Sequence, residues 1–436
     1  MTERDRASIL SSQREIWALG IEDTFVPQPD RRTGRILDEY VLTGHDRLWR
    51  DDLRLVADIG VRWLRYGIPW YLVTPAPGVY DWAWTDAVLP YLVEDLGIQP
   101  IVDLIHYGAP LWLEGTFLSR DYPGYVAEYA AAVAERYGHL VRQWTPLNEP
   151  RVHAHFAGRA SAWPPYRRGE RGFSQVFVGL ARGMALTVDA IRAHVPNAEI
   201  VHVEALSVID TAVPALVPEV ERRMEQPFLA LDLVEGRVGE DHPMHPWLVR
   251  HGVDPRDLAE LARPGRHMDV FGGNFYPQAS CWTIDGSVER PRSRRRRGTA
   301  EDLEAAIRQA AIRVDRPVLV TETSVYGSRS ARRKWLEQVA ASSDRLRADR
   351  VPLLGITWFP AFSLFSWDYR RGRRAPEAYL SHMGLWDLVP DETGHLARVP
   401  TGLDDRFREL ATGSGGDSGA GSVRATETRP RRGSQG

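Results

Sequence analysis

Short apolar runs rich in β-branched residues alternate along the chain with longer stretches of helical periodicity, from residue 15 to about residue 411. Runs of this length and composition are typical of buried strands. We expect strands at Ile16–Ile21, Val61–Tyr66, Gln99–His106, Val141–Leu147, Glu199–Leu206, Met268–Phe275, Pro317–Glu322 and Leu353–Trp358. Apolar residues recur every three or four positions in the stretches between them, which predicts helices at Arg47–Ile59, Tyr122–Tyr137, Ser174–Ala193, Thr299–Ile312 and Ala331–Ser342.

The alternation of strands and helices predicts an α/β fold with a parallel sheet. Eight strands with intervening helices favour a closed (β/α)8 TIM barrel. An open doubly wound sheet is the alternative, but no glycine-rich phosphate turn follows the first strand. We expect a single barrel domain over residues 15–411, an N-terminal extension over residues 1–14, and a disordered tail rich in Gly, Ser and Arg over residues 412–436.

Composition and charge narrow the classes of partner. The formal net charge is −3, from 55 basic and 58 acidic residues, so no overall field favours a nucleic acid or a membrane surface, and no apolar run approaches transmembrane length. The single cysteine, Cys281, excludes an internal disulfide. Charged residues interrupt the first 19 positions, unlike a secretory signal, so we expect a cytoplasmic protein.

Two glutamates close apolar strands. Glu149 follows the fourth strand in WTPLNEP, and Glu322 ends the seventh in RPVLVTETS. The carboxyl ends of barrel strands converge on one concave mouth, so these two side chains are expected to face each other there. Hydrolysis of a glycosidic bond needs two such carboxyl groups, one to protonate the leaving oxygen and one to attack or to activate water. The pair therefore predicts a glycoside hydrolase.

Six segments carry a more specific resemblance: RWLRYGIPWYL, DLIHYGAP, TPLNEP, FGGNFYPQ, TETS and GITWF. In this order they resemble the strand-end motifs of glycoside hydrolase family 1, β-glucosidase-like enzymes within the clan of (β/α)8-barrel retaining glycosidases. The resemblance implies that Glu149 is the acid/base and Glu322 the nucleophile. It implies substrate-binding roles for Arg65, His106, Asn148, Asn274, Tyr276 and Trp358. Gln28 lies near the family's first-strand glutamine and is added to this set.

The chain departs from the family pattern at three places. The family's nucleophile motif Thr-Glu-Asn-Gly is Thr-Glu-Thr-Ser here, and its tryptophan after the third-strand histidine is Tyr107. The acidic residue expected after the eighth strand is missing from FPAFSLFSWDYRRG, where Trp367 or Asp368 could replace it. In the family, that residue normally binds the outer hydroxyls of the sugar. The implied substrate is therefore a small-molecule or oligosaccharide β-glycoside, and the resemblance does not specify which sugar it carries.

Other interpretations stay open at this stage. The same pair of carboxylates could serve a transglycosidase, and the barrel could be a non-catalytic carbohydrate-binding protein. His202 and Glu204, two apart on one strand, could form a metal site with His153 and His155, but their spacing is not diagnostic, and we expect no metal and no cofactor. The run Arg294–Arg297 is expected to be a solvated loop over the barrel, with an anion site as the alternative.

Overall fold

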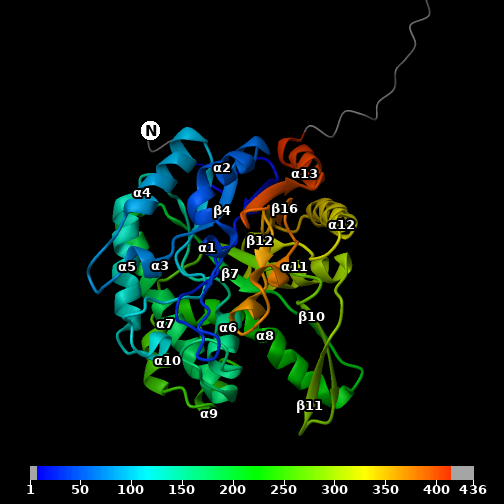
Figure 1. The fold of residues 1–436 in the computed structure, drawn as a ribbon. Coiled ribbons are helices and arrows are strands. Elements are labelled where there is room, and N and C mark those ends of the chain that lie inside the picture. The colour runs from blue at the N-terminus through cyan, green and yellow to red at the C-terminus, as the bar shows by residue number, and fades with distance from the viewer. Residues whose placement is uncertain (1–6, 414–436) are drawn as a thin grey trace, which may run out of the picture.

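The computed structural model describes residues 7–413, and its central feature is a closed barrel of parallel strands surrounded by helices (Figure 1). The eight strands are ordered β1-β13-β12-β9-β7-β6-β5-β4 around the ring, and β4 pairs with β1 to close it. They are β1 (Ile16–Gly20), β4 (Trp63–Gly67), β5 (Gln99–Asp103), β6 (Gln143–Thr145), β7 (Glu199–Ala205), β9 (Val270–Asn274), β12 (Val318–Thr323) and β13 (Leu353–Trp358). Each overlaps one of the predicted strands, and the predicted (β/α)8 barrel is confirmed.

Helices wrap the outside of the barrel. The longer ones are α2 (His45–Asp58), α5 (Tyr122–Tyr137), α7 (Gly169–His194), α8 (Val217–Val234), α11 (Ala300–Val314), α12 (Arg329–Ala348) and α13 (Leu403–Thr412). Shorter ones are α1 (Glu39–Thr43), α3 (Trp70–Val73), α4 (Ala83–Pro90), α6 (Pro150–Ala154), α9 (His245–Arg250) and α10 (Pro255–Leu261). Single turns of other helix types are η1 (Tyr91–Asp95), η2 (Thr116–Leu118), η3 (His155–Arg159), η4 (Pro214–Leu216), η5 (Trp367–Arg370) and η6 (Pro376–Tyr379). All five predicted helices overlap one of the longer ones.

Short strands outside the barrel shape its rim. β8 (Val208–Asp210), β10 (Cys281–Gly286) and β11 (Pro291–Arg295) form a three-stranded sheet, and β10 with β11 is an antiparallel hairpin that projects from the body (Figure 1). Three further pairs are β2 (Phe25–Val26) with β3 (Leu37–Asp38), β14 (Leu364–Phe365) with β15 (Leu380–Ser381), and β16 (Trp386–Pro390) with β17 (Leu396–Pro400). Of these strands, β10, β11, β14 and β15 contribute residues to the wall of a cavity at the barrel mouth.

An apolar layer fills the end of the barrel away from the predicted site. Its buried members are Ile9, Ile16, Ala18, Trp63, Ile101, Val201, Val203, Val270 and Leu319. Because strand side chains alternate between faces, the inward position two residues later belongs to the mouth: Trp63 is followed by Arg65, Ile101 by Asp103 and Leu319 by Thr321. The same strands therefore provide both the apolar floor and the polar site above it.

The described part of the N-terminal extension takes part in that floor. Ile9 is fully buried, and its backbone N–H donates to Glu199 Oε2 at 2.9 Å. Thr412, the first residue of the predicted tail, ends α13. Residues 1–6 of the predicted extension and residues 414–436 of the predicted tail lie outside the described residues.

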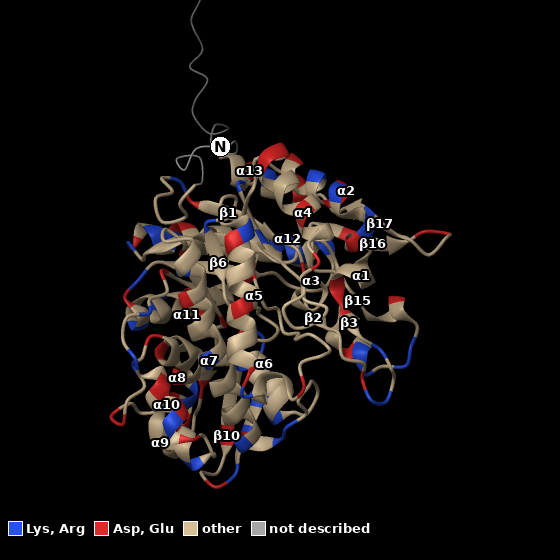
Figure 2. Cartoon of the chain, turned by 90° about the vertical axis from the view of Figure 1, so that its left-hand side faces the viewer, with Lys and Arg blue, Asp and Glu red and all other residues tan. Residues whose placement is uncertain are grey.

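The surface agrees with the balanced composition. Basic and acidic residues are interspersed over the side of the molecule in Figure 2. Across residues 7–413, none of the helices combines the length and the apolar character that a membrane crossing requires.

Candidate active site

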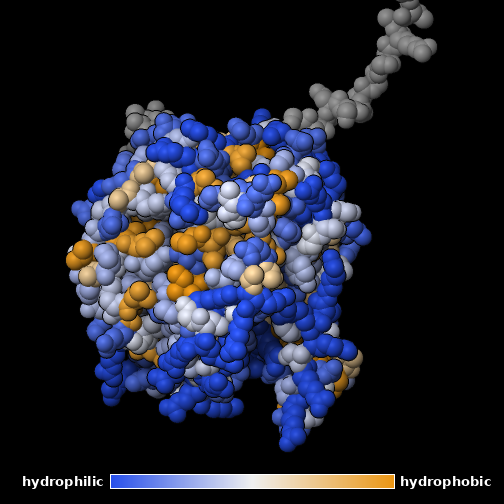
Figure 3. All heavy atoms as spheres, in the orientation of Figure 1, coloured by the Kyte–Doolittle hydropathy of each residue, from blue (hydrophilic) through white to orange (hydrophobic). Residues whose placement is uncertain are grey.

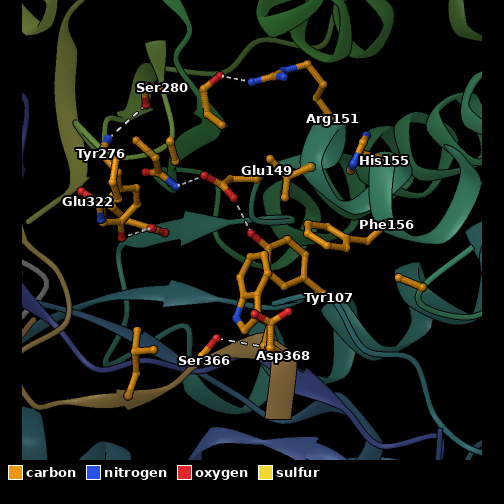
Figure 4. A pocket seen from close by; sticks show the side chains of 18 of the residues that line it. Tyr107, Glu149, Arg151, His155, Phe156, Tyr276, Ser280, Glu322, Ser366 and Asp368 are labelled. Atoms are coloured by element: carbon orange, nitrogen blue, oxygen red, sulfur yellow. Dashed lines mark hydrogen bonds between the residues drawn. The ribbon is translucent and has the colours of Figure 1, made fainter. Parts of the chain in front are cut away.

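A cavity of about 610 Å³ opens at the carboxyl ends of the barrel strands. Both predicted catalytic glutamates line it, together with His106, Asn274 and Tyr276. Figure 4 shows Glu149 and Glu322 directed into the same space, with Tyr107 and Tyr276 reaching them from different elements. The barrel thus brings together groups that lie up to 216 residues apart in the sequence, from His106 to Glu322.

Glu322 lies near the end of β12 between two donors. It forms an ion pair with the guanidinium of Arg65, and the hydroxyl of Tyr276 donates a hydrogen bond of 2.7 Å to its Oε2. Arg65 is fully buried, and nearby Asp103 and Glu322 raise its pKa against the opposing effect of burial. A fixed cation and a phenolic donor both stabilise negative charge on the Glu322 carboxylate.

Glu149 has a different environment. Its φ of 45° and ψ of 64° are left-handed, a conformation that costs a non-glycine residue about 1–2 kcal/mol, and Pro150 begins α6 immediately after it. The hydroxyl of Tyr107 donates to one carboxyl oxygen, and Asn274 Nδ2 donates to the other at 2.9 Å. Burial, and then the charge of Glu322, raise the pKa of Glu149 in spite of these donors. Glu149 therefore holds a proton more readily than an ordinary glutamate.

Asn148 connects the two sides of the site from below. Its Oδ1 accepts from Arg65 at 2.7 Å and from Asn274 at 3.3 Å, and its Nδ2 donates to the Tyr107 hydroxyl at 2.8 Å. Nδ2 also lies 2.9 Å from His106 Nε2. Arg65 and Asn148 are fully buried and do not line the cavity. Arg65 contacts Glu322 and Asn148 contacts Tyr107 from behind the cavity lining.

His106 reaches the cavity from the end of β5. Its Nδ1 lies 2.6 Å from Asp23 Oδ1 and 3.4 Å from Asp103 Oδ2. The side-chain ligand atoms of Asp23, Asp103 and His106 all lie within 4.8 Å of one another, close enough to hold a metal ion. Within residues 7–413, no other group of three or more His, Cys, Asp or Glu side chains meets this criterion. Arg65, whose guanidinium is 2.5 Å from Asp103 Oδ2, places a cation beside that group.

The histidines considered for a metal site are not brought together in the described residues. His202 lies on the face of β7 opposite Val201 and Val203, where its ring is buried against Phe271. Glu204 accepts hydrogen bonds from the backbone N–H groups of Arg151 and Ala205 at 3.0 and 2.8 Å. These contacts are typical of structural rather than metal-binding side chains.

Besides Arg65 and Asn148, two further predicted substrate-binding residues do not line the cavity. Trp358 is fully buried at the end of β13, and its indole N–H donates to the Met383 carbonyl at 3.2 Å. The side chain of Gln28 donates to the Ala109 carbonyl at 2.8 Å. Neither lines the cavity.

Other aromatic rings form the cavity wall instead of Trp358. Tyr107, Phe156, Trp163 and Trp367 all line it, and the ring centroids of Phe156 and Trp163 are 4.6 Å apart. Trp163 packs in turn against Trp367 at 5.2 Å. Such rings offer faces on which the C–H bonds of a sugar or an aromatic leaving group can pack.

Glu22 is a pocket residue that the sequence interpretation missed. It follows β1 by two residues and is only 7% exposed, and Thr24 donates to its Oε1 from its backbone N–H and its hydroxyl at 3.2 and 2.5 Å. Burial raises the pKa of Glu22 to about 7. The strand-end rule that identified Glu149 would also have identified Glu22, had it been applied to the first strand.

Comparisons with known proteins agree with this fold. The model of glycosyl hydrolase family 1 matches residues 17–231. A bifunctional β-D-glucosidase/β-D-fucosidase from Bifidobacterium breve is 33% identical over 187 residues, which are 37% of this chain and 40% of that protein. The cytosolic β-glucosidase of Cavia porcellus is 31% identical over 137 residues, 30% of this chain and 29% of that protein. The chain thus aligns with less than half of the length of these relatives.

Solved structures extend the likeness to the whole barrel. A family 1 β-glucosidase from Thermotoga maritima superposes with a TM-score of 0.78 at 17% identity, covering 93% of this chain and 99% of that one. The β-glucosidase from the same organism in complex with glucoimidazole gives a TM-score of 0.79. The family 1 model is thus matched from β1 to α8, just under half of the chain, and the barrel is shared over nearly all of it, so the chain is similar to glycosyl hydrolase family 1.

Proposed function

We propose that the protein is a retaining β-glycosidase that hydrolyses O-glycosidic bonds, with Glu322 as nucleophile and Glu149 as acid/base. The observation that carries this proposal is the contrast between the two carboxyl groups. Glu322 is held by Arg65 and Tyr276, which favour its anion, whereas burial and Glu322 itself raise the pKa of Glu149. Carboxyl groups with such opposed environments take the acid and nucleophile roles in glycoside hydrolysis.

The reaction would proceed in two displacements. Glu322 attacks the anomeric carbon while Glu149 gives its proton to the glycosidic oxygen, so the C–O bond breaks and the leaving group departs as a neutral alcohol. Water then attacks the anomeric carbon, Glu149 accepts the water proton, and the ester bond to Glu322 breaks to return its carboxylate. The hydrogen bond from Tyr276 and the ion pair with Arg65 stabilise the carboxylate as it is released.

The substrate we propose is a small-molecule or oligosaccharide β-glycoside. Relatives named β-glucosidase and β-D-fucosidase make glucosides and fucosides the first sugars to screen. The loop after β13 brings Ser366, Trp367 and Asp368 to the cavity, where the family pattern predicts an acidic residue. We also propose a cytoplasmic location, because the one cysteine, Cys281, is buried and free.

Azide rescue tests the two roles separately. Glu322→Ala is expected to lose about a thousandfold or more of the turnover of a 2,4-dinitrophenyl β-glycoside, and azide should restore it as the α-glycosyl azide. Glu149→Ala with azide should give the β-glycosyl azide, because the covalent intermediate still forms. Glu240→Ala, at an exposed glutamate, serves as the matched control and should retain wild-type turnover. Unchanged turnover in Glu322→Ala, or the same azide anomer from both variants, contradicts the assignment.

Product analysis shows whether the sugar is transferred to water or to another acceptor. Wild-type enzyme with an added alcohol should release free sugar as its main product. Transfer of most of the sugar to the alcohol at low alcohol concentration would identify a transglycosidase with the same catalytic pair. Binding of β-glycosides without any turnover would identify a non-catalytic barrel.

A further inference from the structure

One wall of the cavity carries two arginines that the catalytic roles leave unexplained, and between them a histidine, His155, whose pKa burial lowers to about 4. Arg151 lies in α6, and His155 and Arg159 follow at intervals of four residues in η3, so the three side chains share one side of a continuous helical segment. All three line the cavity. In Figure 4, Arg151 lies on one side of Glu149, while Asp368 lies on the other.

The β10–β11 hairpin brings another arginine to this cavity. Trp282 of β10 is paired across the hairpin with Arg295 of β11, both line the cavity, and the guanidinium is 4.9 Å from the centroid of the indole. Arg295 is thus in a strand and not in the solvated loop predicted for Arg294–Arg297. Its neighbour Arg296 is paired with Asp210 and Asp302, but within residues 7–413 Arg295 has no carboxylate partner. Figure 3 shows hydrophilic surface beside the hollow between the hairpin and the body.

The positive charge of this wall is only partly compensated. Arg159 forms an ion pair with Glu170 at 2.8 Å. The guanidinium of Arg151 donates to the Ala205 carbonyl at 2.8 Å and to the Ser207 hydroxyl at 3.2 Å, and its nearest carboxylate, that of Glu204, is 4.0 Å away. Burial raises the pKa of Glu204 to about 8, which leaves that neighbour largely uncharged at neutral pH. The pKa of Arg159 is lowered, first by burial and also by Arg151.

The carboxyl groups of the cavity lie elsewhere. Glu22 follows β1, Glu322 lies in β12 and Asp368 lies in the loop after β13. The helical wall and the hairpin contribute none of the cavity carboxylates apart from Glu149, which precedes α6. The cavity carboxyl groups other than Glu149 thus lie apart from the helical wall, although the loop after β13 that carries Asp368 also brings Arg370 and Arg371 to the lining.

We propose that this wall is a subsite for an anionic group, a carboxylate or a phosphate monoester, on the leaving group of the glycoside. The inference rests on the proposed function, because Glu149 defines the leaving-group side by protonating the glycosidic oxygen. Arg151 lies two residues after Glu149, so a leaving group in contact with Glu149 also reaches this wall. Arg295 and Arg151 supply planar guanidinium donors that match either anion, and Trp282 supplies an aromatic face for the ring that carries it.

The test compares three glycosides of one sugar: 4-nitrophenyl, carboxylated nitrophenyl and phosphorylated nitrophenyl. The quantity measured is kcat/KM for the better anionic glycoside divided by kcat/KM for the neutral one. Because the intrinsic reactivity of each leaving group is the same for every variant, it cancels when this ratio is compared between variants. Arg295→Gln and Arg151→Gln are each expected to lower this ratio about tenfold or more, as for the loss of a charged hydrogen bond. Arg294→Gln, on the same strand but outside the cavity lining, should preserve the wild-type ratio.

The ratio should also fall as salt is added, because the contacts are partly exposed to solvent. A ratio that is the same in the wild type, Arg295→Gln and Arg151→Gln overturns the subsite while leaving the hydrolase assignment intact. If no glycoside is turned over, binding of the free nitrophenols is measured instead, by titration followed through tryptophan fluorescence. Arginine-dependent preference for the anionic phenol then supports the subsite and rejects the proposed function, and equal binding of all the phenols rejects the subsite.

Discussion

At the scale of single residues, Tyr107 is the departure from the family pattern that lies closest to the chemistry. Its hydroxyl donates to Glu149 and accepts from Asn148, so it joins the proposed acid/base to the buried network. The donor stabilises the ionised form of Glu149 and lowers its pKa, against the larger effects of burial and Glu322. In the proposed mechanism, activity requires protonated Glu149 and is lost as the pH rises through that pKa.

Tyr107→Phe is therefore expected to move the alkaline limb of the kcat/KM profile to higher pH, because the donor that favours the anion is gone. The measurement is the pH dependence of kcat/KM with an aryl β-glycoside. Tyr326→Phe, at a side chain that is 58% exposed, is the control and should leave the limb in place. A shift to lower pH in Tyr107→Phe would mean that the hydroxyl acts in another way.

Glu22 is the second residue whose role can be tested alone. As a buried carboxyl beside the sugar space, it could hydrogen-bond a sugar hydroxyl, the task that the family assigns to the missing acidic residue after the eighth strand. Glu22→Gln is expected to raise KM about tenfold or more, since hydrogen bonds to charged groups contribute about 1.5–3 kcal/mol. Asp368→Asn changes an exposed carboxyl of the same cavity, and steady-state kinetics should show the smaller effect there. The reverse order would assign the task to Asp368.

At the scale of elements, the N-terminal segment acts as a plug under the barrel. Ile9 is fully buried among Ile16, Trp63 and other members of the apolar floor, and Gln143 donates to the Ala7 carbonyl at 2.9 Å. Ile9→Ala should destabilise the protein by about 2–5 kcal/mol, because it removes buried methyl groups and leaves a cavity. Urea unfolding would measure this as a lower midpoint. Leu10→Ala, at a side chain that is 42% exposed, should change the midpoint little, and equal effects would show that the plug is not tightly packed.

At the scale of the whole molecule, the last barrel strand must close against the first. β13 pairs with β1 through Ile16 and Gly355, and a Cβ at Gly355 would lie 2.0 Å from the Ile16 carbonyl oxygen. Gly355→Ala is expected to cost about 1–3 kcal/mol or more, with a lower thermal midpoint and reduced turnover, because the strands that carry the site are forced apart. Gly124→Ala, in α5 with no atom within 4 Å of the added Cβ, should be neutral or stabilising. Equal midpoints in the two variants would show that the closure tolerates a side chain.

The sequence by itself determined the barrel and the position of Glu149 and Glu322 at its mouth. Short apolar runs rich in β-branched residues and helical periodicity are local properties, and they predicted all eight strands to within a few residues. Glu149 and Glu322 were predictable for a related reason: in a closed parallel barrel, the end of any strand lies at the same mouth, whatever its distance along the chain. The predicted positions of His106, Asn274 and Tyr276 at the cavity follow from this rule too.

Tertiary structure alone decided which of the other polar and aromatic groups face the cavity. Trp358 ends a barrel strand, but neighbouring side chains cover it and its indole bonds to Met383. Arg295 belongs to the run Arg294–Arg297, for which the sequence predicts a solvated loop. In the structure it is paired with Trp282 across the hairpin and lines the cavity. Strand ends are set by local periodicity, whereas loop positions depend on pairings between segments far apart, such as β8 with β10, that no local pattern encodes.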